Sequence, residues 1–380
     1  MKNAKEPKYG ILSSKRMYIE MLKKLTETLT DRRQEWKILH SLHEIIVMVI
    51  CAVVAGSEAW YQIEHYCQSK EKWFRKKLKL KLANGIPSHD TFERVFAMID
   101  PKEFQENFHI WTSETVKLIE GETISIDGKT ICASKGDEHR AIHMVSAWAN
   151  SQKLVLGQVR TNEKSNEITA VPQLLDTLDI AGCVVTADAM SCQKDIAERI
   201  TDKQADYVLG LKSNQPNLHD DVKLYFDSFE GSQKITTKEK GHGRIETREY
   251  YLETDIDWLW QKAKWPGLNG IGMVKSRVLE NDAFREETRY FITSLTDVKR
   301  FAKSTREHWG IENSLHWVLD VAFNEDNCRM RKDNSGENFA VIRHFALNLL
   351  RKDSSKMSIK AKRHRCAYDD DFLFNILFQG

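Results

Sequence analysis

The stretch Gly121-Glu-Thr-Ile-Ser-Ile-Asp-Gly-Lys129 decides how the rest of the chain folds. Its residues alternate in polarity from Thr123 to Ile126, which is typical of a β-strand with one buried face. Asp127 follows that strand and precedes Gly128, a residue that lets a ligand approach the backbone closely. A carboxylate in this position suits a hard cation such as Mg²⁺. Because Asp-Gly is also a common hairpin turn, the stretch by itself predicts either a turn or a metal site.

The composition is that of a globular protein. The chain has 380 residues, 41% of them hydrophobic and 29% charged, which is enough for two or three domains. The net charge is only +2, so a surface for nucleic acid has to come from local clustering of cations. The seven cysteines contain no C-x-x-C pair, which predicts reduced thiols and no structural zinc. The most apolar run, residues 45–55, is shorter than the ~20 residues that span a bilayer. We therefore expect a cytoplasmic protein with no membrane association.

Residues 1–120 are expected to form an all-helical N-terminal domain. Helical patterns cover 14–29, 41–55, 57–69, 71–81, 88–99 and 101–120. A basic run from Lys70 to Lys81, followed by Gly85-Ile-Pro-Ser88, resembles a helix-turn-helix whose second helix enters the major groove of DNA. A basic run is equally typical of a solvated helix face, so the sequence leaves both interpretations open.

Strands alternate with helices after residue 120. Strands are expected at 123–126, 141–148, 154–159, 183–190 and 206–212, and helices at 166–178, 192–200 and 217–229. The unbroken apolar run in 183–190 predicts a central parallel strand. A three-stranded meander followed by helix, strand, helix and strand is the order of a ribonuclease-H-like α/β core. We assign its first part to 121–230, a β-rich insertion to 231–295, its completion to 296–352, and a basic then acidic tail to 353–380.

Asp188 ends its strand as Asp127 ends the first one. If the two strands are neighbours, both carboxylates emerge close together. Two ionised acids at that spacing repel each other unless a cation neutralises them. Their placement is thus an argument for a metal ion.

A third acid, Glu312, lies in Arg306-Glu-His-Trp-Gly-Ile-Glu-Asn-Ser-Leu-His-Trp-Val-Leu-Asp320. It sits beside an apolar helical stripe that includes Ile311, so it projects toward the sheet and needs a partner. Arg306 is the structural explanation, and a shared metal is the catalytic one. Glu325 and Asp326 are rival sources of a third carboxylate.

Together these motifs resemble a known family. The chain is similar, from about residue 22 to 351, to bacterial insertion-sequence transposases of the H-repeat-associated type, within the DDE superfamily. The motifs that carry the resemblance are Ile126-Asp-Gly-Lys129, His143-Met-Val-Ser-Ala147, Lys164-Ser-Asn-Glu167, Thr186-Ala-Asp-Ala-Met190, Asp206-Tyr-Val-Leu-Gly-Leu-Lys-Ser-Asn-Gln215, His242-Gly-Arg-Ile-Glu246, His308-Trp-Gly-Ile-Glu-Asn313 and His316-Trp-Val-Leu-Asp-Val-Ala-Phe323. The resemblance implies a ribonuclease-H-like core in which Asp127, Asp188 and Glu312 are the catalytic and metal-binding acids.

The resemblance also implies an activity. The enzyme would cleave the ends of an insertion element and transfer them into target DNA, as a homodimer on DNA. The three acids would hold two Mg²⁺ ions ~3.5–4 Å apart, with Mn²⁺ able to substitute. Two alternatives stay open: a metal-dependent nuclease of the same fold that does not transpose, and an inactive relic that only binds DNA.

Cationic and histidine side chains are the candidates for DNA contact. Related transposases often have arginine four residues before the glutamate and lysine seven after it, where this chain has His308 and Leu319. Arg306 and the Asn313/His316 pair are possible substitutes. The candidates are Lys72, Arg75, Lys76, Lys129, Lys212, His242, Arg244, Arg306, His308, His316, Arg329 and Arg331. Such contacts would make DNA binding depend on salt.

Overall fold

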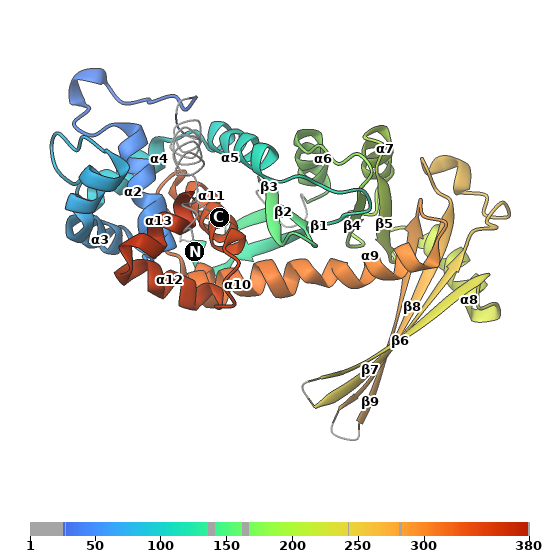
Figure 1. The fold of residues 1–380 in the computed structure, drawn as a ribbon. Coiled ribbons are helices and arrows are strands. Elements are labelled where there is room, and N and C mark those ends of the chain that lie inside the picture. Colours follow the sequence, from blue (N-terminus) through green and yellow to red (C-terminus); the bar gives the residue numbers. More distant parts are fainter. Residues whose placement is uncertain are drawn as a thin grey trace, which may run out of the picture.

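A helical region lies at one end of the molecule, a sheet covered by helices lies in the middle, and a long twisted set of strands lies at the other end (Figure 1). The computed structural model describes residues 26, 28–135, 141–161, 167–241, 243–280 and 283–378. The helix expected over 14–29 falls almost wholly outside these residues. No helix in the described part of the chain is both long and apolar enough to cross a membrane.

The helical end begins with one short 3₁₀ turn that was not expected from the sequence, η1 (Glu35–Lys37), followed by helices in the expected ranges. These are α2 (Leu42–Val54), α3 (Trp60–Trp73), the π-helical turn η2 (Phe74–Leu78), α4 (His89–Met98) and α5 (Pro101–Thr115). Ser41 caps α2, because its hydroxyl accepts a hydrogen bond from the Glu44 N–H at 3.2 Å. Residues 79–88 separate η2 from α4. This connection is longer than the 3–4-residue turn typical of a helix-turn-helix. Contact between this region and DNA stays a prediction.

The C-terminal residues complete the same helical core. They form α11 (Ser335–Lys352), α12 (Ile359–Tyr368) and α13 (Asp370–Phe378), and α11 packs against α2, α4 and α5. Two acids of the tail pair with the basic run: Lys70 Nζ lies 2.5 Å from Asp370, and Lys77 Nζ lies 3.4 Å from Asp371. The opposite charges noted in these distant segments therefore meet.

A single nine-stranded sheet runs through the rest of the molecule in the order β3-β2-β1-β4-β5-β9-β8-β7-β6. The strands are β1 (Thr123–Ile131), β2 (Ile142–Ala149), β3 (Leu154–Thr161), β4 (Val184–Ala187), β5 (Asp206–Leu211), β6 (Gln233–Gly241), β7 (Arg244–Glu253), β8 (Gly270–Glu280) and β9 (Ala283–Thr293). The first five have the ribonuclease-H-like order, and β4 is parallel to both β1 and β5. The prediction of a central parallel strand is thus confirmed.

The β-rich segment after residue 231 extends the core sheet. β9 pairs antiparallel with β5, with Val208 opposite Thr293 and Leu211 opposite Tyr290. The four added strands are long and project away from the core (Figure 1). The insertion is therefore hydrogen-bonded to the core sheet through β5.

Helices cover both faces of the sheet. Helices α6 (Glu167–Thr177) and α7 (Lys194–Asp202) lie on one face, and α9 (Val298–Ile311) runs along the other (Figure 1). The shorter elements are η3 (Cys132–Ser134), α8 (Pro216–Ser228), η5 (Lys262–Lys264), the π-helical turn η6 (Glu312–His316), α10 (Trp317–Phe323) and η7 (Glu325–Asn327). Helix α9 contacts β1, β4 and β7, and Phe301 on it packs onto Gly272, where a Cβ would lie 2.3 Å from the ring. Because of this close packing, α9 lies along the sheet, and its C-terminal end lies beside β1.

Candidate active site

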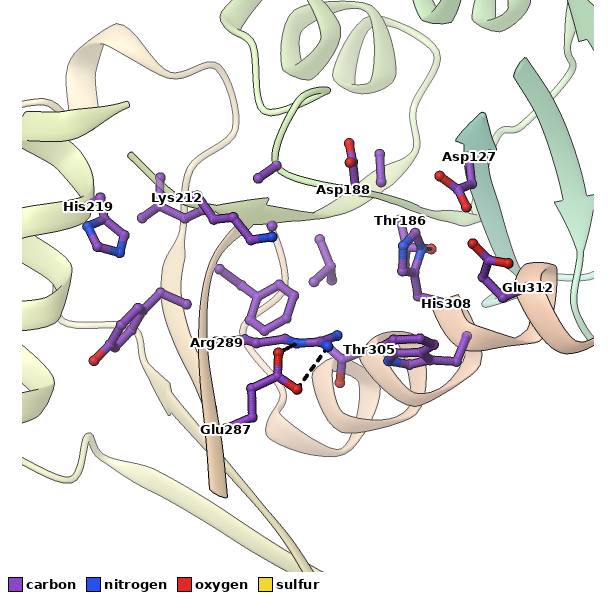
Figure 2. Close-up of a pocket in the computed structure, with 18 of the residues that line it drawn as sticks. Asp127, Thr186, Asp188, Lys212, His219, Glu287, Arg289, Thr305, His308 and Glu312 are labelled. Atoms are coloured by element: carbon purple, nitrogen blue, oxygen red, sulfur yellow. Dashed lines mark hydrogen bonds and ion pairs between the residues drawn. The ribbon is translucent and has the colours of Figure 1, made fainter. Parts of the chain in front are cut away.

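Three acids from three elements line one cavity of about 460 Å³. Asp127 belongs to β1, Asp188 directly follows β4, and Glu312 is the first residue of η6. In Figure 2 the carboxyl groups of Asp127 and Glu312 face each other, and Asp188 lies nearby at the end of its strand. The parallel pairing of Ile126 with Ala187 explains why Asp127 and Asp188 emerge at neighbouring points. The structure thus brings together the three acids singled out in the sequence.

A fourth residue, His316, joins this site from the π-helical turn η6. The turn spans Glu312–His316, and such turns are frequent at functional sites because they reorient side chains within a helix. His316 is buried, and its Nδ1 lies 3.4 Å from Glu312 Oε2 and 3.8 Å from Asp127 Oδ2. One ligand atom from each of these three residues lies within 4.8 Å of the others. His316 was predicted only as a DNA contact, although its spacing of four from Glu312 could have indicated a shared site.

The electrostatics of the site favour a cation. The pKa of Asp127 is raised to about 7, mainly by burial and to a smaller extent by the charges of Glu312 and Asp188, against the opposing effects of His316 and of the Gly128 backbone hydrogen bond. The hydrogen bond from His316 lowers the pKa of Glu312. Carboxylate oxygens are the ligands that Mg²⁺ prefers, and an imidazole nitrogen also suits Mn²⁺. The residues present therefore fit a divalent cation.

Asp188 is held by its own turn. Its Oδ1 accepts hydrogen bonds from the backbone N–H groups of Met190 at 3.0 Å and Ser191 at 3.3 Å. The residue is exposed and lines the cavity from the side of β4. Because the local backbone fixes one oxygen, the direction of the carboxylate is set before any ligand binds.

His308 occupies the place where related transposases often have arginine. Its Nδ1 shares a hydrogen bond of 3.0 Å with the hydroxyl of Thr186, which donates to Ser125 Oγ at 3.2 Å. Burial lowers the pKa of His308 to about 4. The ring is therefore neutral near pH 7 and offers a hydrogen bond where an arginine would offer a charge.

A buried pair supports β1 directly behind the site. His143 Nε2 lies 2.6 Å from Glu167 Oε1, and its Nδ1 lies 2.8 Å from the Thr130 hydroxyl. A Cβ on Gly128 would lie 2.4 Å from both His143 Nε2 and Glu167 Oε1. Residue 128 has to be glycine for this pair to sit against the strand. Glu167 also lines the cavity of the acids. It ends the sequence motif Lys164-Ser-Asn-Glu167, which was noted for its resemblance but was given no role at the site.

Lys129 is surrounded by acids. Its Nζ lies 2.7 Å from Asp320, 2.9 Å from Asp326 and 3.4 Å from Glu325. Although burial opposes its charge, these carboxylates raise the pKa of Lys129. The structure therefore places the two rivals of Glu312 around a lysine, and Glu325 also faces Arg343 at 3.7 Å.

The other cations expected at DNA fall into separate groups. Lys212 and His308 line the cavity of the acids, while Arg244 and Arg306 line an adjoining cavity on the β-rich segment. Lys72, Arg75 and Lys76 lie on α3 and η2 in the helical end, distant from the sheet (Figure 1). Arg329 is exposed, Arg331 donates to the Ala133 carbonyl at 2.7 Å, and His242 lies outside the described residues. Their roles at DNA stay predictions.

The strand order and the acids on β1, after β4 and after α9 define a ribonuclease-H-like protein with a DDE arrangement. The chain belongs to the transposase DDE domain family, whose model matches residues 111–349, and the associated N-terminal family matches residues 24–112.

Relatives of known name cover nearly the whole chain. It is 41% identical to "Putative transposase YncI" of Escherichia coli O157:H7, over 95% of each chain. It is 38% identical to "H repeat-associated putative transposase YhhI" of Escherichia coli K12, over 94% of this chain and 98% of that one. Among solved structures it resembles the piggyBac transposase in a synaptic complex with hairpin DNA, with a TM-score of 0.45 and 11% identity, over 96% of this chain and 79% of the other. The chain is thus a member of a transposase family.

Proposed function

We propose that this chain cleaves DNA at the ends of an insertion element and joins those ends to target DNA, with Asp127, Asp188 and Glu312 as its catalytic acids. The observation that carries the proposal is the convergence of these acids, from three distant segments, on one cavity. The raised pKa of Asp127 is a second support, because an ionised carboxylate is costly there without a cation. We further propose that the protein acts as a homodimer on paired DNA ends, as the family resemblance implies.

In this proposal the acids bind the metal ions, and other residues of the cavity contact the DNA. Asp127, Asp188 and Glu312 hold divalent cations, Mg²⁺ or Mn²⁺, and His316 is placed to join them through Nδ1. When bound, such ions activate an attacking hydroxyl and stabilise the leaving oxygen. Neutral His308, held through Nδ1 by Thr186, lines the same cavity, and Lys212 provides a positive charge at its far side (Figure 2).

The test is cleavage of a supercoiled plasmid that carries the element's ends, in the presence of Mg²⁺ or Mn²⁺. We expect the wild type to nick at the ends and to produce joined strand-transfer products. Asp127→Asn, Asp188→Asn and Glu312→Gln should each reduce cleavage by at least ~10³-fold, a loss typical of removing an essential catalytic group. DNA binding in EDTA should survive each change.

Two matched controls are available on the same elements or nearby helices. Glu307→Gln on α9 and Asp195→Asn on α7 remove carboxylates that lie outside the cavity, so both should cleave normally. Normal cleavage by Glu312→Gln would move the third ligand to another acid and contradict the assignment. Nicks without joined products would favour a nuclease that does not transpose.

A further inference from the structure

Trp309 stands at the boundary between two cavities. It lies three residues, or just under one helical turn, before Glu312, and its side chain is 41% exposed. It lines the cavity of the acids and also a second cavity, formed by β7, β8, β9 and α9. Arg289 and Phe291 on β9 line both cavities as well. A path that leads out of the active site toward the β-rich segment therefore passes the indole ring.

Arg289 holds this ring from the strand side. Its guanidinium carbon lies 4.6 Å from the centre of the Trp309 ring, a distance at which a cation–π attraction operates. Glu287 fixes the guanidinium by two hydrogen bonds, 2.7 Å from Nε and 3.0 Å from Nη2. The contact joins β9 to α9 and keeps an exposed aromatic surface in a defined place.

The wall of the second cavity is rich in arginine. Side chains of a strand point alternately to opposite faces, and here alternate residues of β7 from Arg244 to Tyr250 and of β9 from Arg285 to Phe291 line the cavity. Five arginines and two glutamates line it, the arginines being Arg244, Arg248, Arg285, Arg289 and Arg306. Glu239 orients two of them, 3.0 Å from Arg306 and 3.3 Å from Arg248. The excess of positive charge suits a phosphate backbone.

We propose that this second cavity binds unpaired nucleotides of the DNA strand next to the bond that is cut, with Trp309 stacking on a base and the arginines contacting its phosphates. An aromatic ring combined with cationic side chains is how proteins hold single strands, because every base offers a flat face. A duplex keeps its bases stacked on one another and gains little from an exposed ring. The inference rests on the proposed function, since it takes the three acids to mark the cleaved bond.

The test measures binding in EDTA, so that it requires no cleavage. The probes are fluorescein-labelled oligothymidylate of about 20 nucleotides, long enough for a single-strand site, and a blunt duplex of the same length. Stacking on one base contributes ~1–3 kcal/mol, so Trp309→Ala should weaken binding of the oligothymidylate by about 5- to 150-fold. The duplex should bind almost as before, and Trp309→Phe should retain most of the single-strand affinity.

The matched control is Trp317→Ala. Trp317 lies on α10 in the same helical run, is 61% exposed and lines neither cavity. The Trp317→Ala variant should bind both probes like the wild type, and melting temperatures should show that each variant is folded. The proposal is overturned if Trp309→Ala binds the oligothymidylate normally, or if both tryptophan variants lose affinity equally.

A second pair of variants tests the arginine wall independently. Changing both Arg244 and Arg285 to alanine should lower the salt slope of oligothymidylate binding by ~1.4, since each phosphate contact on a single strand contributes ~0.7. Arg277→Ala on β8 is the control, because Arg277 is exposed outside this cavity. An unchanged slope in the double variant would remove the arginines from the proposal.

The outcomes separate this inference from the proposed function. A protein that binds single strands through Trp309 yet never cuts with Mg²⁺ keeps the inference and loses the catalytic proposal. A protein that cuts normally and shows no effect of Trp309→Ala on single-strand binding keeps the catalytic proposal and loses the inference.

Discussion

Asp127 is partly buried among groups that oppose its ionisation. Its pKa rises from an ordinary 3.8 to about 7, with burial as the largest cause and the acids Glu312 and Asp188 adding to it. A carboxyl whose pKa is raised by folding binds its proton more tightly in the folded state. Stability of the metal-free protein therefore falls as pH rises from about 4 to about 7, and it changes little with this group above that range.

Replacing Asp127 by asparagine should remove this cost. In EDTA at pH 8 we expect Asp127→Asn to melt a few degrees above the wild type, given ~2–4 °C per kcal/mol in a large domain. At pH 4 the difference should shrink, because the wild-type carboxyl is then protonated. Thermal melts at both pH values, with Asp195→Asn as the control, measure this. A lower melting temperature for Asp127→Asn at pH 8 would show that the carboxylate stabilises the metal-free fold.

Three short elements meet at Lys129. The lysine lies on β1, and its partners are Asp320 on α10 and the acids Glu325 and Asp326 on η7. Its side chain is only 11% exposed, and that of Glu325 only 3%. Removing one partner of a buried ion pair costs ~3–5 kcal/mol, because a charge is left without compensation.

Lys129→Met should therefore lower the free energy of unfolding by ~3–5 kcal/mol, as measured by urea denaturation. The surface pair of Lys262 with Asp257 provides the control: Lys262→Met should cost less than ~1 kcal/mol. If Lys129→Met keeps full stability and instead weakens DNA binding, the lysine serves DNA as the sequence suggested, and its acidic neighbours do not depend on it.

At the scale of the whole molecule, helix α2 and the C-terminal helices α12 and α13 share one core. Leu373 on α13 is fully buried in the cluster that contains most of α2. Arg363 on α12 is also buried; it donates to the Val53 carbonyl at 2.7 Å and pairs with Glu58 at 2.5 Å. The C-terminal helices therefore stabilise a region that begins some 300 residues earlier.

Leu373→Ala should cost ~2–5 kcal/mol, as other large-to-small changes in a core do. The loss should appear in the helical end, so that limited proteolysis cuts α2 and α3 sooner than in the wild type. Tyr368→Ala, at a position 77% exposed, should stay within ~0.5 kcal/mol. Faster proteolysis confined to the last 30 residues or so would mean that the tail is a separate unit.

Local physics made much of this protein predictable. The apolar run before Asp188 depends on neighbours within a few residues, and the structure forms that strand where expected. The strand expected at 123–126 is longer than predicted: β1 continues through Asp127 and Gly128 to Ile131, so Asp127-Gly128 is not a hairpin turn. Strand order followed as well, because short connections limit how successive strands and helices can pack. The placement of Asp188 after its strand and of Glu312 beside an apolar helical stripe belongs to this class of information.

Only the tertiary structure decided which distant residues meet. His316 joins Asp127 because a π-helical turn and the packing of α9 on the sheet set its direction. Lys129 faces acids nearly 200 residues away, and Trp309 meets Arg289 only because β9 pairs with β5. Sequence patterns report the period and polarity of one element at a time. The distance between side chains on different elements depends on how all of those elements pack, and no local pattern contains it.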